Sequence, residues 1–136
     1  MEKKVYKEIN GKKVIAYEKD IYGFEHWYEY DSNGNKIYYK NSGDFEKWYD
    51  YDFNGNLIYT KDNTDYEEWY EYDAKGNKIH YKNSRGDETW SEYNSNGRKI
   101  YFKNKIGYEN CIARTIVNMH KYEITGEYIK ECNSEV

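Results

Sequence analysis

Tryptophans recur at a fixed interval of 21 residues in this sequence, at Trp27, Trp48, Trp69 and Trp90. Tyrosines and lysines accompany each of them. Aromatic rings are enriched at the centres of protein interfaces, and rings combined with lysines form the stacking platforms that single-stranded nucleic acids need. The periodic aromatic side chains are therefore the candidate binding surface of this chain.

An acidic residue also recurs, two positions after each tryptophan, at Glu29, Asp50, Glu71 and Glu92. Acid–base catalysis needs carboxyl groups in different environments, whereas a repeated position offers each carboxyl the same one. We interpret this column as structural. The three histidines, His26, His80 and His120, have no repeated cysteine or serine partner, and His80 stands where the other repeats have tyrosine.

The sequence indicates a metal site as weakly as it indicates a catalytic site. Asp31, Asn33 and Asn35 match the first three ligand positions of a calcium loop, but Gly34 falls in the wrong place and no glutamate follows at the twelfth position. Cys111 and Cys132 are too isolated for a zinc site or a disulfide framework. We expect no metal, no cofactor and no enzymatic activity.

The composition predicts one globular domain over residues 1–136. The net charge is −4, and 19 Tyr, 4 Trp and 4 Phe supply the apolar area that few aliphatic residues could supply. No apolar run is long enough to span a bilayer, and the first residues lack the apolar core of a signal peptide. We therefore expect a cytoplasmic protein without a membrane partner.

Four segments repeat almost position by position: WYEYDSNGNKIYYKN, WYDYDFNGNLIYTKD, WYEYDAKGNKIHYKN and WSEYNSNGRKIYFKN. Residues 24–107 hold these four clear repeats. Residues 1–23 contain a partial copy, and residues 108–136 contain a degenerate copy with Cys111 in the tryptophan position. Atypical end repeats are typical of arrays that cap themselves.

Each repeat predicts a β-hairpin, because aromatic and β-branched segments flank an Asx-Gly cluster. Ser32–Gly34 fits a three-residue hairpin loop with Gly34 in the left-handed conformation. The links between hairpins, such as Ser42–Gly43, are predicted as two-residue turns. The expected fold is all-β: an antiparallel meander of tandem hairpins in a curled or twisted sheet, barrel-like if it closes.

The odd period leaves two registers open. With one odd and one even loop in each repeat, Trp27, Ile37, Tyr39 and Trp48 share one face, and Tyr28, Tyr38, Lys36 and Lys40 share the other. Shifting the register by one residue would instead place Tyr28, Tyr30, Ile37 and Tyr39 on a charge-free face, with Trp27, Glu29, Lys36 and Lys40 opposite. Turn chemistry favours the first register and charge segregation favours the second. We prefer the first.

The strings YEYDSNGNKI, YDYDFNGNLI and YEYDAKGNKI resemble the YD repeats of the RHS family. The resemblance covers residues 24–104. It implies strand-turn-strand repeats that build β-scaffolds, and a setting among toxin, immunity or phage-defence systems. A looser similarity links WYEYDSNG to choline- and glucan-binding cell-wall repeats, and the period is comparable to that of MORN-like antitoxin repeats.

Three functions follow as hypotheses. The favoured one is a non-catalytic protein-binding scaffold, such as an immunity protein or a phage-encoded inhibitor of a bacterial defence enzyme like a CRISPR nuclease. The alternatives are binding of single-stranded nucleic acid through a Tyr/Lys face and binding of cell-wall carbohydrate. Edge strands could also pair in a homodimer. In the preferred register the partner-binding residues are Tyr28, Tyr38, Tyr49, Tyr59, Tyr70, Tyr101, Lys36, Lys40, Lys82 and Lys103.

Overall fold

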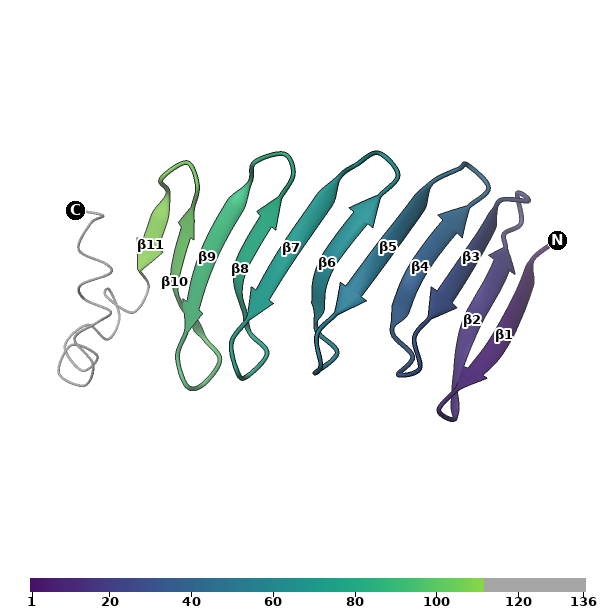
Figure 1. Ribbon diagram of the computed structural model, residues 1–136, viewed down its shortest axis with the longest axis horizontal. Coiled ribbons are helices and arrows are strands. Elements are labelled where there is room, and N and C mark those ends of the chain that lie inside the picture. The colour runs from purple at the N-terminus through teal and green to yellow at the C-terminus, as the bar shows by residue number, and fades with distance from the viewer. Residues whose placement is uncertain (112–136) are drawn as a thin grey trace. The chain divides into compact units, whose positions relative to one another are not determined.

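The computed structural model describes residues 1–111, which form antiparallel β-strands and no helix. The strands follow one another in sheet order from β1 to β11 (Figure 1). This confirms the all-β meander, and in the described residues no pairing joins β1 to β11, so the barrel-like form is not present. Residues 112–136, which hold most of the degenerate last repeat, lie outside the described residues.

The strands are β1 Lys3–Ile9, β2 Lys12–Lys19, β3 Glu25–Tyr30, β4 Lys36–Asn41, β5 Glu46–Tyr51, β6 Leu57–Asp62, β7 Glu67–Tyr72, β8 Lys78–Asn83, β9 Glu88–Tyr93, β10 Lys99–Asn104 and β11 Glu109–Cys111.

The chain divides into two compact units, Met1–Trp69 and Tyr70–Val136, with the boundary inside β7. The first unit contains β1 to β6 and the start of β7. The second contains the rest of β7 and β8 to β11. In the part of the chain that the structure describes, no helix is long and apolar enough to cross a bilayer.

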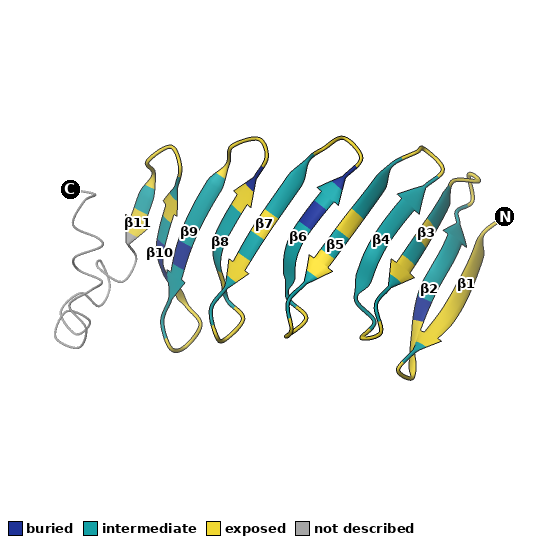
Figure 2. Cartoon of the chain, viewed as in Figure 1, coloured by how far each residue is buried: buried dark blue, intermediate teal, exposed yellow. Residues whose placement is uncertain are grey.

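Few side chains of the described residues are fully buried. The buried apolar ones are Val14, Ile100 and Tyr101, and most strand residues are half-buried (Figure 2). Each unit is therefore held together largely by contacts between neighbouring strands and not by a thick core. Cross-strand aromatic pairs, each of which contributes on the order of 0.2–1 kcal/mol, supply much of that stability.

The hairpin loops are organised by their first residue. In the β3–β4 loop, Oδ1 of Asp31 accepts the backbone N–H groups of Asn33 at 3.0 Å and Asn35 at 2.9 Å. Gly34 has a φ of 86°, and its N–H donates to the Asp31 carbonyl at 3.1 Å. The predicted three-residue loop is confirmed. Because the Asn35 N–H stabilises the charged form, the pKa of Asp31 is lowered, and its carboxylate is engaged by its own loop.

The links between hairpins have the same three-residue form, so the predicted two-residue turn at Ser42–Gly43 is wrong. In the β4–β5 link, Asn41 and Phe45 close the loop, and Asp44 takes the left-handed conformation with a φ of 62°. Oδ1 of Asn41 accepts the N–H groups of Gly43 and Phe45 at 2.9 and 3.2 Å. Aspartate is one of the few residues besides glycine that tolerate this backbone conformation.

A β-bulge in the hairpins accommodates the odd period of 21 residues. In the β3–β4 pair, Tyr30 lies opposite Lys36 but Glu29 lies opposite Tyr38, so Ile37 is one residue in excess. The β5–β6 and β9–β10 pairs show the same shift, with Ile58 and Ile100 as the extra residues. Because the bulged residue is left out of the ladder, it absorbs the odd residue of the 21-residue period, and equivalent side chains keep the same face from one repeat to the next.

The bulge makes the preferred register wrong. Trp27 lies opposite Lys40, and Tyr28 lies opposite Tyr39. Residues that face each other across a strand pair share a face of the sheet, so the alternative register is the correct one for these positions. Lys36 is the exception, because its ammonium lies against the tyrosines.

The alignment of the indoles is confirmed within the first unit. The pairs Tyr17–Trp27, Tyr38–Trp48 and Tyr59–Trp69 have the same register, so their tryptophans share one face. We call this face the Trp face and the opposite one, which carries Tyr28, Tyr39 and Tyr49, the Tyr face. In the second unit the Trp face carries His80 and Trp90, and the Tyr face carries Tyr70 and Tyr81.

Candidate functional site

The structure divides the predicted binding residues between the two faces, so the single Tyr/Lys face is wrong. The bulge is the reason, since it moves each second strand by one residue relative to the first. The Tyr face holds Tyr28, Tyr49, Tyr70 and Lys36, and the Trp face holds Tyr38, Tyr59, Tyr101, Lys40, Lys82 and Lys103.

On the Tyr face, Lys36 lies among three tyrosine rings. Its Nζ is 5.8 Å from the ring centroids of Tyr28 and Tyr39 and 4.9 Å from that of Tyr49. Burial, with the charge of Lys47 nearby, lowers the pKa of Lys36, and the negative faces of the three rings oppose that shift. The cluster is filled by the chain itself, which marks it as structural.

On the Trp face, directly opposed residues form oblique rows across the strands. One complete row of the first unit consists of Glu29, Tyr38, Trp48, Lys61 and Glu67. The rings of Tyr38 and Trp48 are 5.6 Å apart and tilted by 46°, and Trp48 is 40% exposed. This row thus presents an indole between a tyrosine and a lysine, with an acidic residue at each end.

The tyrosines of these rows are fixed by carboxylates. The hydroxyl of Tyr38 donates to Glu46, and that of Tyr59 donates to Glu67 at 3.1 Å. The hydrogen bond to Glu46, followed by burial, raises the pKa of Tyr38 to about 12. The indoles therefore pack against rings that are themselves held in place.

The second unit contains a variant of this row, formed by Glu71, His80, Trp90, Lys103 and Glu109. The imidazole of His80 stacks on the indole of Trp90, with centroids 5.5 Å apart and planes 18° apart. Its Nδ1 lies 3.2 Å from Glu71, and its Nε2 lies 2.7 Å from Oε2 of Glu88 in β9. The Lys103 ammonium lies 5.9 Å from the centroid of the Trp90 indole.

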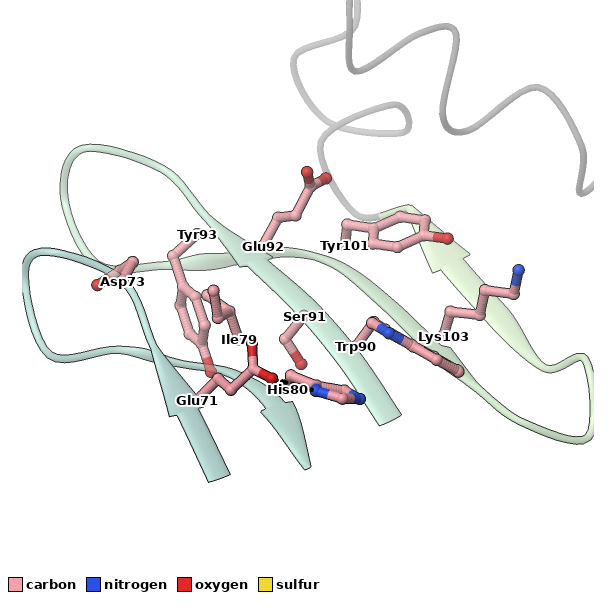
Figure 3. Close-up of a pocket in the computed structure, with 10 residues that line it drawn as sticks. All are labelled: Glu71, Asp73, Ile79, His80, Trp90, Ser91, Glu92, Tyr93, Tyr101 and Lys103. Atoms are coloured by element: carbon pink, nitrogen blue, oxygen red, sulfur yellow. Dashed lines mark hydrogen bonds and ion pairs between the residues drawn. The ribbon is translucent and has the colours of Figure 1, made fainter. Parts of the chain in front are cut away.

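A hollow of about 820 Å³ opens at this row (Figure 3). Figure 3 shows the Glu71 carboxylate reaching the imidazole of His80, next to the indole of Trp90. The hollow combines carboxylates, aromatic rings and one lysine. The Trp-face residues that line it are Glu71, His80, Trp90, Glu92, Tyr101 and Lys103.

His80 makes the second unit sensitive to pH. Burial alone would lower the pKa of His80, but the hydrogen bonds to Glu88 and Glu71 outweigh burial and raise it. A raised pKa in the folded state adds stability that is fully present below the ordinary value of about 6.5 and is lost as pH rises through the folded-state value. We expect wild type to lose stability between about pH 6 and about pH 8, and His80→Tyr to lose less.

Urea unfolding at the two pH values measures this difference, and an NMR titration of the His80 ring gives its pKa directly. A His80 that titrates below its ordinary value would contradict the prediction. His80→Tyr serves as the matched variant because tyrosine occupies the same position in the other repeats.

Sequence reasoning did not identify the hollow. In the sequence, His80 only stands where the other repeats have tyrosine, and the repeated acidic residues indicate a structural role. The signal that could have located the site is an ionisable residue, His80, at a repeat position that is otherwise tyrosine. The same repeat also carries Glu71, two residues after Trp69. In the described residues, no group of three or more His, Cys, Asp or Glu side chains is placed to hold a metal ion.

Comparison with known proteins yields matches in structure and none in sequence. No protein-family model matches this chain, and no curated protein matches it. The crystal structure of TcdB2-TccC3-TEV aligns with a TM-score of 0.60 and 20% identity over 68% of this chain. The crystal structure of TcdB2-TccC3 aligns with a TM-score of 0.57 and 19% identity over 67% of it.

A third match is the structure of the Tc holotoxin pore of Photorhabdus luminescens, which contains a TccC3 variant, with a TM-score of 0.57 and 20% identity over 68% of this chain. This chain spans about 5% of the length of each of these chains. At such identities the likeness shows the fold alone, a meander of β-hairpin repeats.

Proposed function

We propose that this chain is a non-catalytic scaffold of β-hairpin repeats that binds a protein partner through its Trp face. One observation carries the proposal: in the first unit Trp27, Trp48 and Trp69 share a face and remain 36%, 40% and 37% exposed. A contiguous exposed aromatic surface marks an interaction site, and tryptophan and tyrosine are enriched among the residues that dominate binding energy.

The exposed rings are held in place before a partner arrives. Each indole packs on a tyrosine of the neighbouring strand, with centroids 5.6–5.8 Å apart. Rings that are already ordered lose little conformational entropy on binding, so more of the contact energy is available as affinity.

The charges of the Trp face favour a protein over a nucleic-acid strand. In the row described above, Lys61 lies between Trp48 and Glu67, and Glu29 stands at the other end. A phosphate backbone would meet carboxylates beside each lysine, whereas a protein surface can offer groups of both signs.

The finer form of the proposal concerns the kind of partner. The chain would act in the cytoplasm as an immunity protein or a phage-encoded inhibitor, and its partner would be a bacterial toxin or a defence enzyme such as a CRISPR nuclease. Two observations support this form: the resemblance of the repeats to the YD repeats of toxin-associated proteins, and the fold shared with a Tc holotoxin component.

Photo-crosslinking at two adjacent residues tests the Trp face. A benzoyl-phenylalanine at position 48 lies on the Trp face, and one at position 49 lies on the Tyr face of the same strand. In cells that contain the partner, we expect position 48 to give one protein crosslink and position 49 to give none. Equal crosslinking from both positions, or crosslinks to nucleic acid alone, would count against the proposal.

A further inference from the structure

Lys78, at the start of β8, is not among the residues that line the hollow in the second unit. His80, two residues further along β8, lies opposite Trp90 on the Trp face. The Lys78 ammonium, however, lies 5.5 Å from the centroids of both Tyr70 and Tyr81, which belong to the Tyr face. Lys78 thus directs its charge to the Tyr face, as Lys36 does in the first unit, and adds none to the hollow.

The residues that line the hollow are predominantly acidic and aromatic. Glu71 comes from β7 and Glu92 from β9, the two strands on either side of β8, and neighbouring strands lie about 4.8 Å apart. The Glu71 side chain is 68% exposed, which leaves its carboxylate accessible from solvent. In the row across the strands, His80 stands between Glu71 and Trp90, and Lys103 lies on the other side of Trp90.

We propose that this hollow receives an arginine side chain of the partner protein, a step that rests on the proposed protein-binding function. The guanidinium stacks on the Trp90 indole and donates hydrogen bonds to the Glu71 carboxylate. A planar, delocalised cation satisfies both surfaces at once, since arginine stacks on aromatic faces and matches carboxylate geometry better than lysine does.

Lys103 shows that the Trp90 indole accepts a cation. Its ammonium lies 5.9 Å from the indole centroid, near the outer limit of a cation–π contact, and its side chain is exposed. It is therefore a weakly held internal cation that competes with an incoming guanidinium for the indole. Removing it should improve binding, whereas removing the Glu71 charge should weaken it.

A titration on the purified chain tests the site without the partner. The probe is N-acetyl-arginine amide, followed through the indole N–H signal of Trp90 by NMR. N-acetyl-lysine amide and the neutral N-acetyl-citrulline amide serve as comparison ligands. We expect saturable binding of the arginine derivative, weaker binding of the lysine derivative and no saturation with the citrulline derivative.

Three variants sharpen the test. Glu71→Gln should weaken binding about two- to fivefold, the value of an exposed ion pair. Lys103→Met should strengthen it about two- to fivefold, the value of an exposed cation–π contact. Glu8→Gln, which makes the same charge change on the exposed strand β1, should leave it unchanged.

Binding that ignores Glu71→Gln, or that is weakened by Lys103→Met, would overturn the arginine site. So would equal binding of the citrulline derivative. Because the titration uses no partner, its failure leaves the crosslink at position 48 to decide the proposed function separately. A crosslink with no arginine binding would mean that the Trp face binds protein through other contacts.

Discussion

Replacing Lys36 by glutamate is expected to destabilise the first unit by at least about 2 kcal/mol. The wild-type ammonium lies 4.9–5.8 Å from three tyrosine centroids, and three such contacts contribute about 0.5–1 kcal/mol each. A carboxylate would lose these contacts and would place negative charge against the negative faces of the rings. Urea unfolding measures the loss, and urea is preferable to guanidinium because it does not screen charge.

Lys36→Leu is the matched control for this prediction. Leu57 occupies the equivalent position of the next hairpin, so leucine is compatible with the local backbone. We expect this variant to lose clearly less stability than the glutamate variant. Similar losses for the two variants would show that the rings respond to the length of the side chain and not to its charge.

The second large effect is expected at Ile100, the extra residue of the β9–β10 bulge. Ile100 is 3% exposed, and aspartate there would bury an unpaired carboxyl group. Burial of an unpaired charge costs several kcal/mol, so Ile100→Asp should cost at least about 3 kcal/mol or abolish folding of the second unit. Urea unfolding followed by the signal of Trp90 checks this result.

Two further variants control for this substitution. Ile100→Val keeps the apolar surface and should cost about 0.5–1.5 kcal/mol. Ile58→Asp makes the same chemical change at the equivalent bulge of β6, where the side chain is only half-buried, and should be milder. An Ile100→Asp protein as stable as Ile100→Val would mean that the bulge residue opens to solvent at little cost.

The sequence alone predicts the strands, the hairpin loops and the alignment of the indoles. Strand positions follow from the aromatic and β-branched runs, and the loop follows from Asp31 and the left-handed Gly34. These features are local, so neighbouring residues determine them.

The assignment of residues to faces could not be predicted in the same way. An odd period is satisfied equally by an odd and an even loop or by two odd loops with a bulge. Ile37, the bulged residue, is an ordinary strand residue in the sequence, and Asp44 takes the left-handed conformation although Gly43 stands beside it. Turn chemistry favours the observed loop and charge segregation favours the observed faces, and the bulge allows both to hold.

The candidate site depends on that missing detail. The hollow brings together side chains of β7 to β10, and no local pattern of residue types shows which of them share a face. The rows of the Trp face could not be predicted from the sequence for the same reason, because a shift of one residue decides which side chains lie opposite each other.

The surplus residue in each bulge also bears on how such a gene tolerates change. If the codon for Ile58 were lost, Leu57 would directly precede Tyr59, and the pairs Tyr51–Leu57 and Asp50–Tyr59 would persist in a regular ladder. The hairpins that follow would keep their orientation. An evolving lineage can therefore shorten this strand by one amino acid without inverting the rest of the array.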